Sequence, residues 1–142
     1  MTEKEKMLKE MLYDANNDVD LLKERAIAKD LCFKFNQLMP SDTVNQKKIL
    51  HQLLGPIDDS TCIMSPFWCD YGYNIKIGRH FFANHNTVIL DGAEVTFGDN
   101  VVIGGGSVVV KDIPSNSVAV GNPCHVIREI TDKDEQTNWN HN

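Results

Sequence analysis

The sequence predicts a mainly β protein: a short parallel β-helix built from six-residue repeats and preceded by a helical appendage. The first observation behind this prediction is an apolar or small residue that recurs at Ile77, Ala83, Ile89, Phe97, Ile103 and Val109. The second is that glycine or asparagine, which tolerate tight corners with positive φ, directly follows Ile77, Ala83, Phe97 and Ile103. A period of six is neither helical nor a strand alternation, and it describes one short strand and one corner per repeat.

One step of the repeat is irregular. Ile89 and Phe97 are eight positions apart, so two extra residues must bulge at a corner near Asp91 and Gly92. The alternative fold is an antiparallel meander, in which Asp-Gly and Gly-Asp-Asn would form hairpin turns. A meander does not require an apolar residue at every sixth position on both sides of a turn, so the fixed period favours the β-helix.

The N-terminal block begins with two predicted helices. Thr2 and Glu5 have capping-box spacing at the start of the first helix. Asp18 or Asp20 would cap the second, which must end before Pro40 because the residue preceding a proline disfavours the α conformation. Helical spacing places these residues on the apolar faces: Met7, Met11 and Leu12 in the first helix; Leu21, Leu22, Ala26, Ile27, Leu31 and Phe35 in the second.

A third helix completes the appendage, residues 1–57. Thr43 and Gln46 offer another capping box, and Gly55-Pro56 stops the helix. Its apolar face would consist of Ile49, Leu50, Leu53 and Leu54. This block has too little apolar surface for a core of its own, so we expect it to pack on the β-helix.

Residues 58–130 are predicted to form the short β-helix. The extended run CIMSPFWCDYGYNIKIG would lead into two recognisable coils, residues 111–114 would close the ladder, and residues 118–120 would form a last strand. So short a solenoid needs caps or oligomerisation to cover its ends. The tail, residues 131–142, is polar, and we expect it to be frayed with at most one helical turn.

Composition excludes several classes of protein. With 142 residues, 42 % of them hydrophobic and 24 % charged, the chain fits one globular domain. Its net charge of −6 argues against a nucleic-acid partner. The charged N-terminus is not a signal peptide and no apolar run could span a membrane, so we expect a cytoplasmic protein. Four cysteines without C-x-x-C spacing predict reduced thiols and no metal site: Cys32, Cys62, Cys69 and Cys124.

Three blocks of the chain resemble the maltose and galactoside O-acetyltransferases, which are hexapeptide-repeat acyltransferases: EKEKMLKEMLYDANND, CDYGYNIKIGRHFFANHNTVILD and GGGSVVVKDIPSNSVAVGNPCHVIREI. The resemblance covers residues 3–130. It implies a left-handed parallel β-helix, a homotrimer, and acetyl transfer from acetyl-CoA to a sugar hydroxyl. The left hand follows from the resemblance alone, because parallel crossovers are otherwise right-handed.

The resemblance implies that six residues contact the sugar acceptor: Asp14, Arg25, Asp70, Phe82, Asn84 and Asp91. Carboxylates and amides can hold sugar hydroxyls, and Phe82 can cover an apolar sugar face. Asp14, Asn84 and Asp91 are explained equally well as turn or corner residues.

On the cofactor side, the resemblance implies contacts from Gly105, Ser107, Val110, Lys111, His125 and Arg128. The glycine run, residues 104–106, permits close approach of an extended CoA arm. Lys111 and Arg128 suit phosphates, although Lys111 could also be a solvated turn residue. His125 stands where relatives commonly carry arginine, so its phosphate contact would be weaker and pH-dependent.

The expected catalytic base is missing. In relatives it is the histidine of a T-x-x-H-P segment on an excursion in mid-ladder, whereas here Gly98-Asp99-Asn100 runs directly into Val101. We interpret this as an in-frame internal deletion that kept the repeat phase and removed the base, much of the CoA groove and part of the trimer surface. No catalytic residue is therefore identified. His85, next to Asn84, could replace the base, but the sequence shows no partner that would orient its ring.

Three functions follow. The first is a sugar O-acetyltransferase that uses acetyl-CoA, acts on maltose, glucose or a galactoside, and has impaired turnover. The second is a non-catalytic member of the family that only assembles. The third is a module that keeps weak affinity for CoA or sugar.

Overall fold

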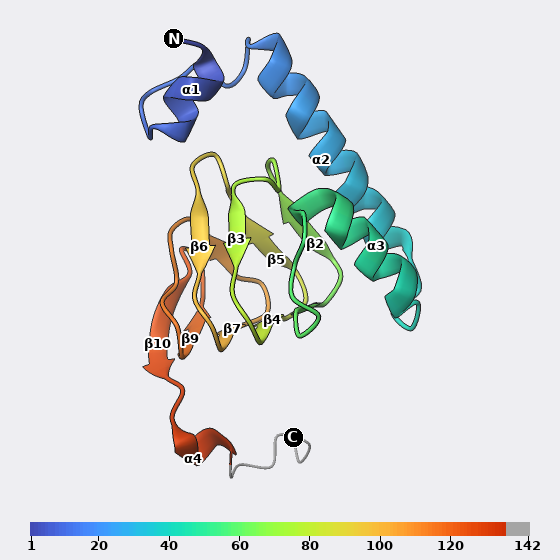
Figure 1. Ribbon diagram of the computed structural model, residues 1–142, viewed down its shortest axis with the longest axis vertical. Helices are drawn as coiled ribbons and strands as arrows, with labels where there is room; N and C mark the ends of the chain where they lie inside the picture. Colours follow the sequence, from blue (N-terminus) through green and yellow to red (C-terminus); the bar gives the residue numbers. More distant parts are fainter. Residues whose placement is uncertain (136–142) are drawn as a thin grey trace.

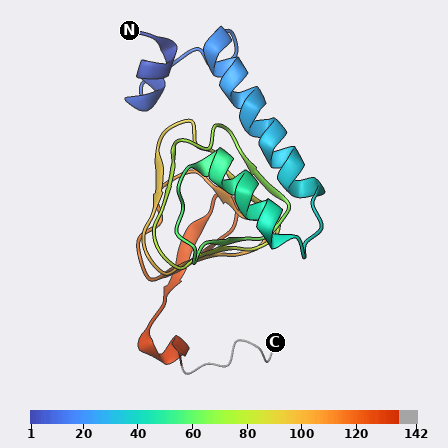
Figure 2. The ribbon, with the colours of Figure 1, turned by 45° about the vertical axis from the view of Figure 1, so that its right-hand side comes forward.

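The computed structural model describes residues 1–135, which form a triangular β-helix with helices before and after it (Figure 1). The helices are α1 (Glu3–Leu8), α2 (Val19–Gln37), α3 (Thr43–Leu54) and α4 (Asp132–Glu135). The strands are β1 (Cys62–Ile63), β2 (Phe67–Cys69), β3 (Ile75–Ile77), β4 (Phe81–Ala83), β5 (Thr87–Ile89), β6 (Val95–Phe97), β7 (Val101–Ile103), β8 (Val108–Val109), β9 (Ser117–Val120) and β10 (His125–Glu129). Figure 2 shows the coils nested around one axis, with α3 lying across one end.

The left-handed winding places these strands on three faces. Sheet A contains β1, β4, β7, β9 and β10, sheet B contains β2, β5 and β8, and sheet C contains β3 and β6. A strand residue of the first or second coil pairs with the residue 20 positions later in the next coil, as Cys62 does with Phe82 and Phe82 with Val102. We name the corners by the sheets they join: AB (residues 64–66, 84–86 and 104–106), BC (70–74, 90–94 and 110–112) and CA (78–80, 98–100 and 114–116).

The β-helix extends beyond the predicted ladder at both ends. The expected lead-in strand is a complete coil, because β1, β2 and β3 each pair with a strand of the next coil. At the other end, residues 111–114 do not close the ladder: Ile113 bridges Phe97, and β9 pairs with β7. The unpredicted β10 then turns back antiparallel to β9. Every residue of β10 is exposed, so its sequence shows no alternation.

The six-residue pattern marks the side chains that fill the prism, as predicted. Five of the six predicted positions are at most 2 % exposed: Ala83, Ile89, Phe97, Ile103 and Val109. The sixth, Ile77, is partly buried against the same core. Phe81 adds to this stack, with its ring centroid 4.8 Å from that of Phe97.

The glycines that follow the inward residues have a different role from the one predicted. Positive φ occurs two residues later, at the third corner position: His80, Asn86, Asn100, Gly106 and Asn116. Gly98 has no positive φ, but a Cβ on it would lie 2.4 Å from the backbone nitrogen of Ser115 in the next coil. Glycine is therefore required there by the close stacking of coils.

All three predicted N-terminal helices are present. The capping box of Thr2 and Glu5 is confirmed at α1, and Asp18 caps α2. The predicted cap of α3 is wrong by one residue: the side chain of Asp42, not Thr43, accepts a backbone N–H, and the helix begins after it. An aspartate carboxylate at the N-cap can accept the N–H of the residue three positions later, as a threonine hydroxyl can. The sequence therefore allowed either Asp42 or Thr43 as the cap.

The helical faces are only partly as predicted. Because α1 ends at Leu8, Met11 and Leu12 lie outside it and are 47 % and 98 % exposed. In α2 the buried residues are Leu21, Ala28, Cys32 and Phe35, whereas Leu22 and Ile27 are exposed. The α3 face is confirmed at Leu50, Leu53 and Leu54, with Ile49 partly buried beside them.

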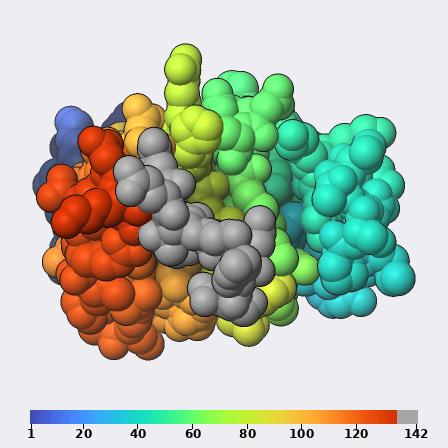
Figure 3. Space-filling view, turned by 90° about the horizontal axis from the view of Figure 1, so that it is seen from below, coloured from blue at the N-terminus to red at the C-terminus, as the bar shows by residue number. Residues whose placement is uncertain are grey.

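The helices and the coils share one core, so the block predicted for residues 1–57 packs on the β-helix as expected. Phe35 of α2 and Leu53 of α3 belong to the same buried cluster as Phe67 and Phe81. Figure 3 shows the red surface of β10 and α4 on the side of the molecule away from α2 and α3. The single turn of α4 fits the prediction for the tail; residues 136–142 lie outside the described part.

A buried carboxylate holds the BC corner, which contains the two extra residues that the sequence predicts. Asp91 is 0 % exposed. Its Oδ1 accepts the N–H groups of Asp70 and Tyr71, both at 2.9 Å, and its Oδ2 accepts that of Gly72 at 2.7 Å. The Asn74 side chain donates to the Asp91 carbonyl oxygen at 2.8 Å. Asp91 of the second coil therefore fixes the backbone of the first.

We predict that Asp91→Asn lowers the free energy of unfolding by about 1–3 kcal/mol. The amide keeps one acceptor oxygen but turns an NH₂ group toward the N–H of Gly72, which leaves a buried donor without a partner. Urea unfolding measures the change. Asp99→Asn is the matched control, since Asp99 accepts one N–H, from Arg79, at an exposed corner, and its effect should stay below about 0.5 kcal/mol. Equal losses in the two variants would contradict the prediction.

Candidate functional site

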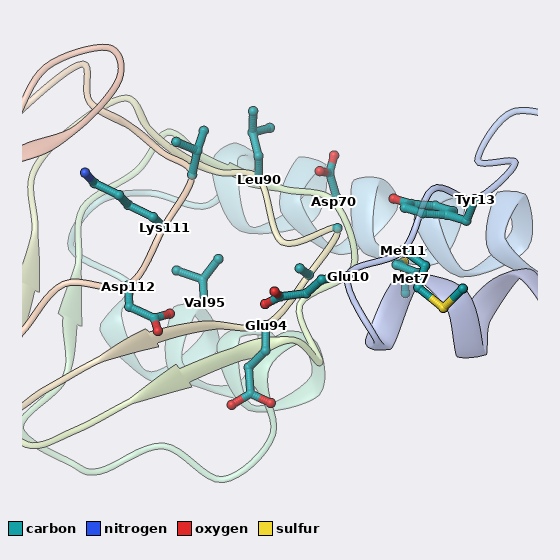
Figure 4. A pocket seen from close by; sticks show the side chains of 13 residues that line it. Met7, Glu10, Met11, Tyr13, Asp70, Leu90, Glu94, Val95, Lys111 and Asp112 are labelled. Atoms are coloured by element: carbon teal, nitrogen blue, oxygen red, sulfur yellow. The ribbon is translucent and has the colours of Figure 1, made fainter.

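A cavity of about 590 Å³ lies where the N-terminal segment faces the BC corner. Met7, Met11 and Tyr13 lie at one end, and Lys111 and Asp112 lie at the other (Figure 4). The three coils contribute Asp70, Leu90 and Val110, which occupy equivalent positions of the corner. The cavity thus brings together three of the predicted site residues: Asp70 from the acceptor side, and Val110 and Lys111 from the CoA side.

The cavity is acidic. Four carboxylates line it, from Glu10, Asp70, Glu94 and Asp112, against the single ammonium of Lys111. Carboxylates accept hydrogen bonds from hydroxyl groups. They repel phosphate, so an anionic ligand would find a favourable charge only beside Lys111. No histidine is among the described residues that line the cavity.

An ion pair and a tyrosine hold the N-terminal segment against this corner. The Lys4 ammonium donates to Glu24 Oε1 at 2.8 Å, and the Tyr73 hydroxyl donates to Glu24 Oε2 at 2.7 Å. Lys4 also lies 4.7 Å from the centre of the Tyr73 ring. Burial alone would raise the pKa of Glu24, but these hydrogen bonds outweigh it and lower that pKa. Three parts of the chain meet here: α1, α2 and the BC corner.

A second group of predicted residues meets at the AB corner, around His85. The Nδ1 atom of His85 lies 2.6 Å from the carbonyl oxygen of Ser65, one coil below. A carbonyl oxygen only accepts, so Nδ1 carries a proton, and in the neutral ring Nε2 then holds the lone pair. The side chain of Asn84 accepts the N–H of His85 at 2.8 Å. The expectation that His85 lacks an orienting partner is therefore wrong.

The other predicted acceptor residues are dispersed. Asp14 is an exposed turn residue whose carboxylate accepts from Asn17. Arg25 donates to the Tyr71 hydroxyl at 3.3 Å and to a backbone carbonyl. Phe82 is half-buried on the outer face of sheet A.

Asp91 is not among the residues that line the cavity. Its carboxylate is buried and accepts the three corner N–H groups. Burial raises the pKa of Asp91 although these hydrogen bonds act to lower it. In this chain its first role is to shape the corner, and a direct sugar contact stays a prediction.

The predicted CoA residues lie at three places: the AB corner, the BC corner and β10. Gly105 is at the AB corner and Ser107 directly follows that corner. Ser107 is buried, and its hydroxyl donates to the Gly104 carbonyl at 2.6 Å. The His125 ring lies nearby, with a carbon 3.5 Å from a Cβ placed on Gly121. Arg128 is on β10, where its guanidinium pairs with Asp134 at 3.0 Å. These roles stay predictions.

The sequence analysis missed the residues that complete the cavity, namely Glu10, Tyr13, Glu94 and Asp112. Asp112 could have been predicted, because it directly follows the predicted site residue Lys111 at a corner of the repeat. Glu10 and Tyr13 lie outside the repeat, so no sequence pattern pointed to them. Within residues 1–135, no three or more His, Cys, Asp or Glu side chains are grouped to hold a metal ion, and no helix has the length and apolarity to cross a membrane. All four cysteines are free thiols.

Comparison with known proteins defines the class. Residues 6–58 match the maltose acetyltransferase hexapeptide capping motif. A protein of Staphylococcus aureus (strain Mu50) that carries an acetyltransferase name is 39 % identical, and 92 % of each chain is covered. One of Saccharomyces cerevisiae, also named as an acetyltransferase, is 41 % identical and covers 89 % of this chain and 92 % of the yeast protein.

Solved structures agree. The maltose O-acetyltransferase from Clostridium difficile 630 is 36 % identical with a TM-score of 0.63, covering 93 % of this chain and 99 % of that one. A galactoside acetyltransferase in complex with coenzyme A is 28 % identical with a TM-score of 0.65, covering 95 % and 94 %. The fold is thus that of the hexapeptide-repeat acetyltransferases. The chain belongs to the maltose and galactoside O-acetyltransferase family and is an acyltransferase by family, as predicted.

The chain is also shorter than these relatives. The match to the S. aureus protein is 184 residues long, so at least 42 of its positions have no counterpart in a chain of 142 residues. The winding shows no break where the sequence predicts the deletion. Strand β7 directly follows Gly98-Asp99-Asn100, and it pairs in register with β4 of the coil before it, from Phe81 with Val101 to Ala83 with Ile103.

We predict that Tyr71 makes the protein less stable at alkaline pH. Burial among Met7 and Leu21 raises the pKa of Tyr71 to about 12. An unfolded tyrosine titrates near pH 10, so its contribution is complete below about pH 10 and is lost as the pH rises toward about 12. Tyr71→Phe should flatten this slope in urea unfolding measured across that range. Parallel curves for the two proteins would show that Tyr71 has no part in it.

Proposed function

We propose that this protein transfers an acetyl group from acetyl-CoA to a hydroxyl of maltose, glucose or a galactoside, with a turnover below that of longer relatives. The observation that carries the proposal is the match to the family across nearly the whole chain, including both ends of the ladder. A solved relative from Vibrio cholerae, 26 % identical, was crystallised with acetyl coenzyme A, which supports this donor.

The acceptor would reach from the AB corner, where its reacting hydroxyl would lie, to the BC cavity. Asp70 faces it and is held by Lys29, whose ammonium is 3.4 Å from its carboxylate and 2.6 Å from the Cys69 carbonyl. An excess of hydroxyl-accepting groups and little positive charge suit a neutral polyol. Phe82 and Asn84 would contact the sugar from the AB side.

The glycines of the AB corner fit an acetyl-CoA arm. A Cβ on Gly105 would come within 3.4 Å of the His85 carbonyl oxygen and 4.0 Å of the Asn84 side chain, so any side chain at this position would fill the space beside them. Around Gly106 nothing lies within 4 Å of an added Cβ. Lys111 and His125 would face the phosphates, and Arg128 would have to exchange Asp134 for a phosphate. Bound acetyl-CoA supplies an activated thioester carbonyl.

A second candidate is a non-catalytic member that only assembles or binds weakly. The absence of histidine among the described residues lining the cavity favours it, because acyl transfer needs a base for the hydroxyl. We further propose that the chain works in the cytoplasm, for which its free thiols are suited, and as a homotrimer. Phe82, Val102 and Val118 line the half-buried outer face of sheet A, which three copies could cover.

We predict slow, sugar-dependent release of the CoA thiol when the protein is mixed with acetyl-CoA and maltose, glucose or a galactoside. A colorimetric thiol assay measures the rate, with acetyl-CoA alone as the control for hydrolysis. Native mass measurement in the same buffer gives the assembly state. Acetyl-CoA binding by calorimetry without sugar-dependent thiol release would instead support the non-catalytic candidate.

Lys111→Ala should raise the KM for acetyl-CoA by about 10- to 100-fold, because a charged hydrogen bond to phosphate is worth about 1.5–3 kcal/mol. Lys76→Ala is the control: Lys76 is exposed on sheet C, and its ammonium donates only to the Tyr73 carbonyl. The assay compares KM at constant ionic strength. An unchanged KM in Lys111→Ala would remove this residue from the phosphate site.

A further inference from the structure

We infer that His85 is the general base that supports acetyl transfer in this chain, in place of the histidine segment it lacks. The inference rests on the proposed function and names the residue that carries its chemistry. It is drawn from three features of the AB corner: the fixed ring of His85, the open glycine corner directly above it, and the surroundings of the other described histidines.

The ring of His85 is held in the tautomer that a base requires. The proton on Nδ1 is directed to the Ser65 carbonyl oxygen at 2.6 Å, which leaves the Nε2 lone pair free to accept. His85 is exposed, and its backbone is fixed on both sides: its N–H is bonded by the Asn84 side chain, and its carbonyl accepts the N–H of Gly106 at 2.9 Å. An oriented ring with one free nitrogen is the usual arrangement of a general base.

Successive coils place the two substrates' predicted contacts on adjacent levels. Asn84 and His85 lie at the corner of the second coil, and Gly105 lies directly above them in the third. The Asn84 N–H donates to the Ile103 carbonyl at 3.0 Å, so the two levels are in direct backbone contact. A thioester beside Gly105 and a hydroxyl beside Asn84 would therefore meet at the corner that carries His85.

The other histidines of the described chain lack this combination. His80 adopts a φ of 55° at the CA corner, where its N–H donates to Ser60. His125 contacts the carbonyl of Pro123, two residues away, at 3.2 Å. His51 lies in α3. None of the three belongs to the corner that Asn84 and Gly105 share.

The step balances as follows. Nε2 of His85 takes the proton of the sugar hydroxyl while its oxygen attacks the thioester carbonyl carbon, forming the C–O bond. The C–S bond then breaks, and the CoA sulfur leaves with the electron pair. The imidazolium returns its proton to this thiolate, which gives the acetylated sugar, free CoA thiol and neutral His85.

Thiol release in three variants tests this role. His85→Ala and His85→Gln should each lower sugar-dependent kcat by roughly 10²-fold or more. His85→Gln keeps a side-chain N–H for Ser65, and circular dichroism confirms that both variants fold. Added imidazole should restore turnover in His85→Ala in proportion to its concentration, which a purely structural role would not allow. His80→Asn is the control, since it removes an exposed imidazole and keeps a residue that tolerates positive φ.

The outcomes separate the two proposals. Loss in both His85 variants, rescue by imidazole and normal turnover in His80→Asn would support the inference. Turnover that survives in His85→Ala would overturn it and leave the proposed function intact. Loss without rescue in folded His85→Ala would also overturn it. No sugar-dependent turnover in the unaltered protein would overturn the proposed function, and the inference with it.

Discussion

The carboxylate of Asp91 is the constraint on which the rest of the site depends. A repeat of six residues leaves room for only a tight corner, whereas the BC corner has two extra residues. The backbone N–H groups of such a longer corner need hydrogen-bond partners to hold it in place. Asp91 accepts the N–H groups of Asp70, Tyr71 and Gly72 in the coil before its own, and so ties the BC corners of these two coils together. The third coil is shorter by four residues, because Val101 and Ser117 are 16 positions apart whereas Phe81 and Val101 are 20. The N-terminal segment closes the cavity beside the BC corners of the three coils.

Sequence was sufficient for what repeats and insufficient for what does not. The inward stack was predictable because each member recurs in phase, and the same steps of six and eight continue back through Cys69 to Ile63. Extending them would have revealed the first coil and placed Ser65 beneath His85. The bond between Glu24 and Tyr73 joins residues 49 positions apart with no periodic relation, so neither the place of α1 nor the cavity could be predicted.

This chain is shorter than its relatives, and at the predicted deletion the corners of successive coils stack directly on one another. At the junction, Asp99 accepts the Arg79 N–H at 2.7 Å, and the Asn100 side chain donates to Asn116 at 2.9 Å, so the contacts between levels are complete. On the predicted deletion of whole coils, the corner expected to face the sugar comes to lie directly beneath the corner expected to face CoA, and His85 belongs to the lower of the two.

Two of the predicted CoA residues are consistent with one extended ligand. Gly105 and Lys111 are joined by β8 and are six residues apart, a separation of at most about 20 Å along the chain. Lys111 has the only positive charge among the lining side chains of the acidic cavity, so phosphates would favour that end. The uncharged glycine corner suits the thioester at the other end. A donor lying along sheet B in this direction would present its reactive carbon to His85, which is where the missing base has to act.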